Sequence, residues 1–163
     1  MEFRIQSKIF SGFKTFEPLL KKWKANHEKI VFTNGCFDII HHGHVDSILR
    51  CAQLGTKLIV GLNTDDSVRL LKGKGRPILG EAGRATILAA FSFVDAVILF
   101  QEETPAKLIS QIAPHILVKG KDYAIHEIAG HETVLKNGGE VKTLDLVPGI
   151  STTDIIQRIK DLD

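Results

Sequence analysis

Five short apolar runs recur along the chain, and each is bounded by polar or turn-forming residues. The runs are rich in Val, Ile and Leu, and they span residues 29–33, 57–62, 96–100, 116–118 and 140–144. Runs of this length and composition are typical of β-strands. Most of them show no alternation of apolar and polar positions, which predicts that both faces of the strands are buried.

Helical periodicity fills several of the intervals around these runs. Apolar residues recur three and four positions apart, as on the buried face of a helix. Helices are predicted in this way with apolar positions at 16, 19, 20 and 23, at 45, 48, 49 and 52, at 108, 109 and 112, and at 155, 156, 159 and 162. Because parallel neighbours need crossover connections, the alternation of strand and helix predicts a parallel sheet with helices on both faces.

The pattern therefore predicts an α/β fold, a single Rossmann-like domain with a five-stranded parallel sheet. The 163 residues, of which 44% are hydrophobic, are enough for one domain with a substantial core. We expect the domain to cover residues 1–163. Residues 1–28 would form a leading helical segment, and residues 29–163 would form the core that carries any catalytic site.

Composition narrows the classes of partner. The formal net charge of +2 is too small to indicate a nucleic acid or an anionic membrane surface. Residues 1–14 lack the apolar stretch of a secretory signal, and no apolar run is long enough to span a membrane. With only two cysteines, Cys36 and Cys51, the chain favours a reducing compartment such as the cytoplasm over a disulfide scaffold.

Polar and glycine-rich loops follow four of the five predicted strands. They span residues 34–44, 63–77, 119–123 and 145–153. In open α/β sheets, ligands bind beyond the carboxyl ends of the strands, at the point where strand order reverses. We expect the loop at 119–123 to face the loop at 34–44 across that point.

Three histidines end the first of these loops, in the sequence His41-His42-Gly43-His44. If a helix begins near Gly43, His41 and His44 face the same side at its amino end, where backbone N–H groups and the helix dipole favour an anion. Two imidazoles there can donate hydrogen bonds to a phosphate under attack. The same residues are compatible with an exposed helix start or a zinc site, although neither cysteine lies in a Cys-x-x-Cys spacing.

Two motifs together resemble those of the cytidylyltransferase-like nucleotidyltransferase superfamily. One is HxGH at 41–44, preceded by Gly-Cys-Phe-Asp at 35–38, and the other is Ile-Ser-Thr-Thr at 150–153. Within the superfamily, the chain most resembles the adenylyltransferase domain of bacterial heptose biosynthesis enzymes, over roughly residues 30–159. The stretches that carry this likeness are 32–38, 71–77, 117–123, 127–130 and 137–141.

The resemblance implies an activity and its setting. The reaction would transfer AMP from ATP to D-glycero-D-manno-heptose 1-phosphate, giving ADP-heptose and pyrophosphate for lipopolysaccharide assembly in the bacterial cytoplasm. A sugar kinase domain often precedes this domain in the family, so the acceptor would come from a separate kinase or from the missing half of a longer chain. Met1 and the leading helix favour a stand-alone protein. Relatives commonly dimerise, and Phe91 and Phe93 could serve such an interface or the core.

The resemblance also implies roles for individual residues. His41, His44 and Lys72 would be catalytic, stabilising the charge that develops on the phosphates. The nucleotide would be bound by Asn34, Gly35, Cys36, Phe37, Gly43, Asn63, Asp65, Lys74, Arg84, Lys119, Gly120, Ser151, Thr152 and Thr153. Asp38, Asp122 and Tyr123 would bind the acceptor. Mg²⁺ would arrive with ATP, and no metal ligand is assigned to the protein.

Departures from related patterns leave alternatives open. Residues 146–149 read Leu-Val-Pro-Gly, where glycerol-3-phosphate cytidylyltransferases carry an arginine-threonine pair. This argues against that branch, but a cytidylyltransferase that uses CTP and a polyol or amino-alcohol phosphate remains the alternative enzyme. A nucleotide sensor on the same fold is the non-catalytic alternative. Ser151 and Asp154 also form a helix-capping pattern, which would be stabilising without any ligand.

Overall fold

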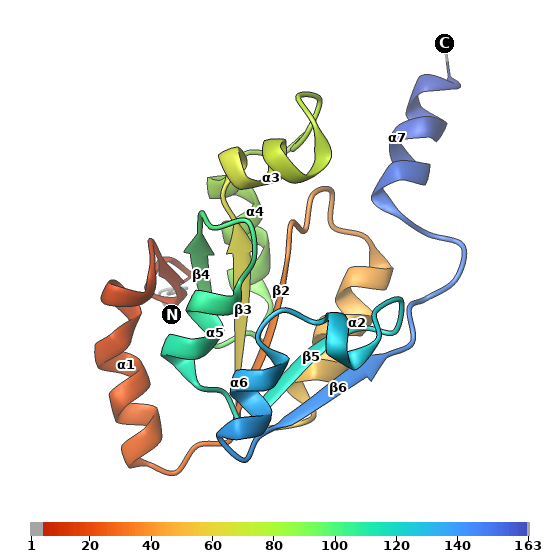
Figure 1. The fold of residues 1–163 in the computed structure, drawn as a ribbon. Coiled ribbons are helices and arrows are strands. Elements are labelled where there is room, and N and C mark those ends of the chain that lie inside the picture. The colour runs from red at the N-terminus through yellow and green to blue at the C-terminus, as the bar shows by residue number, and fades with distance from the viewer. Residues whose placement is uncertain (1–4, 163) are drawn as a thin grey trace.

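The order of the strands determines where a ligand can bind. In the computed structural model, which describes residues 5–162, six strands form one sheet in the order β1-β4-β3-β2-β5-β6, and every pair is parallel (Figure 1). The strands are β1 (Ile9–Phe10), β2 (Ile30–Gly35), β3 (Lys57–Asn63), β4 (Ala96–Phe100), β5 (Ile116–Gly120) and β6 (Glu140–Leu144). The strand order reverses at β2, because β3 and β4 follow on one side of it and β5 and β6 on the other, which places the ligand crevice beyond the carboxyl ends of β2 and β5.

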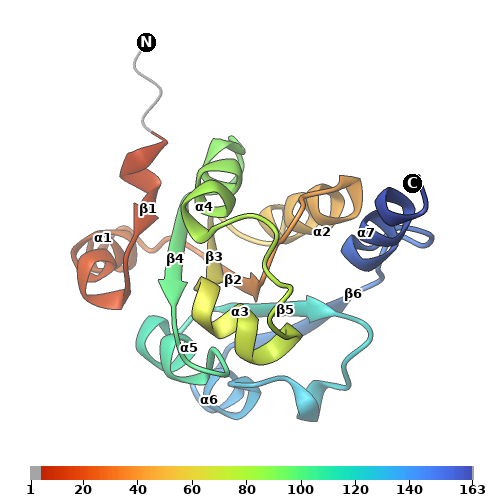
Figure 2. The same cartoon turned by 90° about the horizontal axis from the view of Figure 1, so that it is seen from above.

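Helices cover both faces of the sheet (Figure 2). The α-helices are α1 (Phe13–Ala25), α2 (His42–Ala52), α3 (Asp65–Lys72), α4 (Glu81–Ala90), α5 (Ala106–Ile112), α6 (His131–Lys136) and α7 (Thr152–Lys160), with short 3₁₀ turns at η1 (Gln6–Lys8) and η2 (Ile125–Glu127). Side chains of α1, α5 and α6 pack in one apolar cluster, and side chains of α2 and α4 pack in another. The arrangement confirms the predicted α/β domain with a parallel sheet.

Strand β2 shows why the strands lack an apolar–polar alternation. Ile30 and Phe32 point into the first cluster, whereas Val31, between them, points into the second. All three are fully buried. Successive side chains of a strand face opposite sides, so a strand that is covered on both sides needs apolar residues at every position.

The prediction of five strands is wrong by one, because β1 was not expected. This strand is only two residues long, and it pairs Ile9 with Val97 and Phe10 with Ile98 at the edge of the sheet. Two residues carry no periodicity, so only pairing with β4 makes them a strand. The leading segment thus contributes a strand as well as α1; residues 1–4 and 163 of the expected domain lie outside the described residues.

Two further elements differ from the sequence reading. The interval at 63–77, expected to be a loop, contains α3, whose amino end is capped by the Thr64 hydroxyl, which accepts from the Ser67 N–H. Helix α7 forms as predicted, but none of its residues is buried and the Ile159 side chain is 57% exposed. Figure 1 shows α7 projecting away from the sheet. Within residues 5–162, no helix is both long and apolar enough to cross a membrane.

Candidate active site

A cavity of about 730 Å³ opens at the carboxyl ends of the strands, where the strand order reverses. Segments from five connections and the start of α7 line it, although they lie far apart in the sequence. The expected site residues that line it are Asn34, Gly35, Cys36, Phe37, Asp38, His41, Gly43, His44, Asn63, Lys72, Lys119, Asp122, Tyr123, Ser151, Thr152 and Thr153. The fold therefore brings together both motifs and the basic segment between them.

The two motif histidines form one unit at the amino end of α2. His41 is the N-cap residue, and its ring stacks on the ring of His44 with 3.8 Å between centroids. The backbone N–H of His41 donates to Nδ1 of His44 over 3.4 Å. A neutral imidazole that accepts at Nδ1 carries its proton on Nε2, so His44 presents an N–H donor from its other nitrogen.

Both rings are held in the neutral form. Burial, and secondarily the neighbouring His41, lowers the pKa of His44 to about 4. Burial also lowers the pKa of His41, with a further contribution from His42. Nδ1 of His41 is buried and has no hydrogen-bond partner among the described residues. Near pH 7 the pair can therefore donate hydrogen bonds to an anion without carrying a charge of its own.

We predict that the free energy of unfolding falls as the pH drops from 6.5 to about 4. The pKa of His44 is 6.5 in an unperturbed chain and about 4 in the folded protein, so the unfolded chain binds more protons in this window. The stabilisation is complete above pH 6.5 and is lost toward pH 4; it amounts to about 2 kcal/mol after allowance for partial exposure. Urea titrations at several pH values measure it. The matched variant is His44→Asn, which retains an acceptor but cannot titrate, and an equal pH dependence in both proteins would contradict the assignment.

Gly43 is required for the close packing of this loop. A Cβ atom at this position would lie 3.1 Å from two ring atoms of His41 and 3.2 Å from Cγ2 of Ile150. These distances are shorter than ordinary contacts, so a side chain would displace the ring. Ile150 belongs to the second motif, and Gly43 is thus the point where the two motifs touch.

Three cationic side chains surround the same cavity, those of Lys72, Arg76 and Lys119. Lys119, at the end of β5, donates to the backbone oxygen of Asn34 over 3.3 Å, and its Nζ lies 5.5 Å from the ring centroid of Tyr123. Burial lowers its pKa. Lys72 is the last residue of α3, which stops at Gly73 with a φ of 94°. The cations come from two separate segments on either side of the crevice.

The second motif is held against the first by its own hydroxyl groups. Ser151 accepts from the Asp154 N–H over 3.0 Å and donates to the Asp154 carboxylate, which confirms the predicted cap. The Thr152 hydroxyl donates to the backbone oxygen of Asp38 over 2.7 Å. The start of α7 is thereby joined to the loop that precedes the histidines, and Thr152 and Thr153, whose backbone N–H groups have no acceptor within the helix, line the cavity.

The carboxylate of Asp38, expected to bind the acceptor, is already used within the protein. It is 1% exposed and accepts from Arg76 Nε at 2.7 Å and from the N–H groups of Ile78 and Leu79 at 2.8 and 2.9 Å. Burial alone would raise the pKa of this carboxyl, but these hydrogen bonds outweigh burial and lower the pKa. Asp38 lines the cavity wall, but its charge holds the 76–79 segment.

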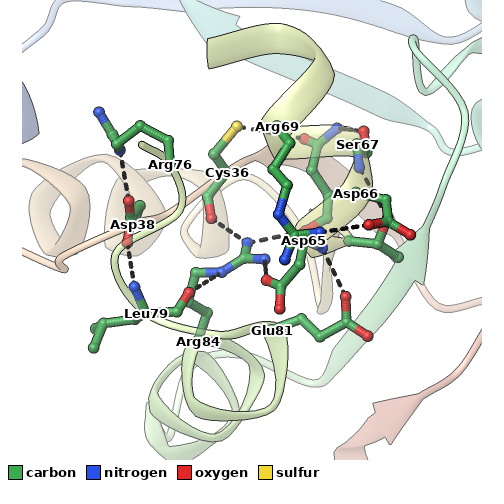
Figure 3. A network of polar contacts seen from close by, with 12 residues as sticks. Cys36, Asp38, Asp65, Asp66, Ser67, Arg69, Arg76, Leu79, Glu81 and Arg84 are labelled. Atoms are coloured by element: carbon green, nitrogen blue, oxygen red, sulfur yellow. Dashed lines mark hydrogen bonds and ion pairs between the residues drawn. The ribbon is translucent and has the colours of Figure 1, made fainter. Parts of the chain in front are cut away.

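Four expected nucleotide-binding residues are not among the described residues that line the cavity: Asp65, Lys74, Arg84 and Gly120. Arg84 is fully buried, and its guanidinium donates to the backbone oxygen of Cys36 and to the Asp65 carboxylate (Figure 3). The side of Gly120 on which a Cβ would lie is filled by Asp122 and Leu146. Asp65 and Arg84 thus bond each other instead of lining the cavity.

Sequence reasoning missed part of the lining. The additional residues are Ser47, Leu71, Arg76, Glu103, Thr104, Pro105, Glu127, Ile128, Ala129, Leu146, Val147 and Ile150. Some had a signal, since residues 127–129 lie in a stretch that carried the resemblance and Arg76 follows Lys72 and Lys74 in one basic segment. Others, such as Ser47 and Glu103, are ordinary polar residues whose position depends on the packing of helices and loops.

The thiol and acidic side chains bear on two kinds of chemistry, attack by a thiolate and binding of a metal ion by the protein. Burial raises the pKa of the Cys36 thiol, although nearby cations oppose the effect, so the nucleophilic thiolate is disfavoured. Within residues 5–162, no group of three or more His, Cys, Asp or Glu side chains is arranged to hold a metal ion. The described residues thus offer hydrogen-bond donors and cations, which is the equipment for binding phosphates.

The chain is similar to several known proteins. The chain is 47% identical over 96% of its length to the bifunctional protein HldE of Rhodopseudomonas palustris (strain BisA53), and 52% identical over 86% to that of Vibrio cholerae serotype O1. It spans 32% and 30% of these relatives, about a third of their length. The crystal structure of the lipopolysaccharide core biosynthesis protein from Thermoplasma volcanium GSS1 matches with a TM-score of 0.61 and 27% identity, over 76% of this chain and 99% of that one.

A family model assigns the chain. The cytidylyltransferase-like model matches residues 32–158, a span that begins within β2 and ends within α7. It includes the histidine motif, the segment of Lys72 and the motif at 150–153, the parts that line the cavity. The chain belongs to the cytidylyltransferase-like family.

Proposed function

We propose that the protein is a heptose 1-phosphate adenylyltransferase, which transfers AMP from ATP to D-glycero-D-manno-heptose 1-phosphate and releases pyrophosphate. One observation carries the proposal: the paired donors His41 and His44, the cations Lys72 and Lys119, and the start of α7 line one cavity. Such a site is suited to a triphosphate. The likeness to proteins named HldE and to a lipopolysaccharide core biosynthesis protein supports a sugar phosphate as the second substrate.

The chemistry is a single displacement at phosphorus. A phosphate oxygen of the sugar 1-phosphate attacks the α-phosphorus of ATP, a new P–O bond forms, and the bond to the β-phosphate breaks with departure of pyrophosphate. No proton has to move, because the attacking phosphate is already an anion. His41 and His44 donate hydrogen bonds to the oxygens on which charge builds up, and Lys72 offsets that charge.

The ends of the nucleotide are held by different elements. The Thr153 hydroxyl and the backbone N–H groups at the start of α7 bind the β- and γ-phosphates, because the hydroxyl protons of Ser151 and Thr152 are already donated to Asp154 and Asp38. Asp122 and Tyr123, on the connection that follows β5, contact the acceptor. Holding both substrates in line removes the entropic cost of their encounter, which is a large share of catalysis in a displacement of this kind.

Mg²⁺ enters this proposal together with ATP. The described residues contain no ready-made ligand cluster for a metal, and Mg²⁺ in such sites is commonly held by phosphate oxygens, a few waters and one or two carboxylates. Asp122 and Glu103, two of the carboxylates that line the cavity, would be the protein groups to contact the ion. When bound, the ion would neutralise charge on the phosphates and favour departure of pyrophosphate.

The proposed setting is the bacterial cytoplasm, where ATP is made and where the free thiols Cys36 and Cys51 stay reduced. A kinase that phosphorylates the anomeric hydroxyl must supply the acceptor. Phe91 and Phe93, expected at an interface or in the core, stack on each other and pack against the second apolar cluster.

The experiment measures pyrophosphate release from ATP and from CTP, with Mg²⁺ and heptose 1-phosphate as acceptor. We expect strong preference for ATP, and no release when the sugar without phosphate replaces heptose 1-phosphate. Preference for CTP, or release only with a polyol or amino-alcohol phosphate, would replace the proposal with the cytidylyltransferase alternative. Binding of ATP without release with any phosphorylated acceptor would indicate a nucleotide sensor.

A further inference from the structure

Arg84 is the largest fully buried side chain of the described protein, and it joins segments that surround the site. From α4, its guanidinium donates to the backbone oxygen of Cys36 at 2.6 Å, in the loop before the histidines. It also donates to the backbone oxygens of Asn63 at 2.9 Å and Leu79 at 2.9 Å, and to the Asp65 carboxylate at 2.7 Å (Figure 3). One side chain thus binds the histidine loop and both ends of the segment that carries Lys72.

The same segment has two more anchors. At its start, the Asp65 N–H donates over 2.7 Å to the carboxylate of Glu81, which like Arg84 belongs to α4. Near its end, the N–H groups of Ile78 and Leu79 donate to the buried carboxylate of Asp38 in the histidine loop. Figure 3 shows Asp38 and Arg84 converging on Leu79 from two sides.

Between these anchors the first turn of α3 is packed, with Val68 fully buried, but the part that follows is exposed. The side chains of Leu70, Leu71 and Ile78 are 79%, 45% and 53% exposed. Apolar burial fixes α3 at Val68 but contributes little beyond it, so polar contacts with α4 and the histidine loop help to set where the end of the helix and Lys72 lie.

We propose that Arg84 is a positioning residue, which sets the placement of Lys72 relative to His41 and His44 and touches neither substrate. In its catalytic consequence this inference rests on the proposed function. Only arginine has a planar fork of donors that can reach several acceptors at once; a lysine ammonium at this depth could not replace the fork. Loss of the fork leaves buried carbonyls unpaired and frees the Lys72 segment.

A double-mutant cycle tests the catalytic part. Arg84→Met should lower kcat for pyrophosphate release by about 10- to 100-fold, as misplacement of a charged group does. In a Lys72→Ala background the same change should lower kcat at most about threefold, because Arg84 acts on turnover through Lys72 and that side chain is absent. The same loss in both backgrounds would overturn the proposal, since a general structural defect acts regardless of Lys72. Arg84→Lys serves as a second variant if Arg84→Met does not fold, with the same test of coupling.

The matched control is Asp95→Asn. Asp95, directly before β4, also links a side chain to a neighbouring strand, accepting from the Leu58 N–H at 2.8 Å and from Lys57 Nζ at 3.3 Å, but these partners lie at the amino end of β3, away from the site. We expect this variant to lower the melting temperature while kcat stays within about twofold of the original value. A loss of kcat as large as that of Arg84→Met would overturn a specific role for Arg84.

Amide hydrogen exchange tests the positional part without any turnover. In Arg84→Met, exchange within residues 64–80 should accelerate, whereas exchange within β3 and β4 should stay as in the original protein. Unchanged exchange in 64–80 would overturn the proposal. If the original protein releases no pyrophosphate with any acceptor, the proposed function fails, and this measurement still decides whether Arg84 holds the segment.

Discussion

Replacing His44 with alanine should lower kcat for pyrophosphate release by a factor of about 10² to 10³, the loss seen when a donor to developing charge is removed. The imidazole is neutral at pH 7, its pKa is lowered to about 4, and its Nδ1 is occupied by the His41 N–H. Its Nε2–H is therefore a fixed donor. Because charge on the phosphates increases only as attack proceeds, the loss should appear in kcat, with a smaller change in the affinity for ATP.

Two variants separate the donor from the ring. The side-chain amide of His44→Gln can place an N–H near the position of Nε2 and should retain part of the activity. The shorter amide of His44→Asn reaches only the region of Nδ1, so its kcat should fall as far as that of His44→Ala. Stopped-flow measurement of pyrophosphate release checks all three. Equal kcat in His44→Ala and the original enzyme would remove His44 from the mechanism.

Replacing Asp38 with alanine should lower the free energy of unfolding by about 3 kcal/mol, the range for breaking one side of a buried ion pair. The Asp38 carboxylate is fully buried and receives three hydrogen bonds, one of them from Arg76, whose side chain is 17% exposed. Its removal leaves the Ile78 and Leu79 N–H groups without an acceptor. For a protein of this size the melting temperature should fall by roughly 6–12 °C.

Calorimetry compares Asp38→Ala with Asp38→Asn, which is close in shape and keeps one acceptor oxygen. We expect the asparagine variant to lose less stability, because it can still bond one of the two backbone N–H groups. If both variants have the same melting temperature as the original protein, the carboxylate does not hold the 76–79 segment. Such a result would restore the expectation that Asp38 is free to contact the acceptor.

Much of the fold could be predicted from local pattern. The strands at 96–100 and 140–144 end where the apolar runs end, and the helices at 42–52 and 152–160 follow their periodicity and capping residues. Each of these depends on interactions between residues close in sequence, which a single chain displays directly. The placement of 119–123 opposite 34–44 followed from the strand order typical of such sheets, and the pairing of β2 with β5 confirms it.

The predictions that the structure corrects concern residues whose role depends on partners distant in the sequence. Ile9–Phe10 is a strand only because β4 lies beside it. The sequence also suggested that Arg84 reaches the nucleotide, but a guanidinium binds whichever acceptors surround it, and here these are the carbonyls of Cys36, Asn63 and Leu79.

The sequence by itself determined the alternation of strands and helices and the residues of both motifs, because these are written in spacing and residue type. Only the tertiary structure decided which polar groups remain free for a ligand. Asp38 and Arg84 have the same chemical character as many binding residues, yet each is satisfied within the protein. His44 differs, because the His41 N–H occupies only its Nδ1 and the side chain lines the cavity. The physical reason is that a hydrogen-bonding group serves a substrate only if folding has left it without a partner.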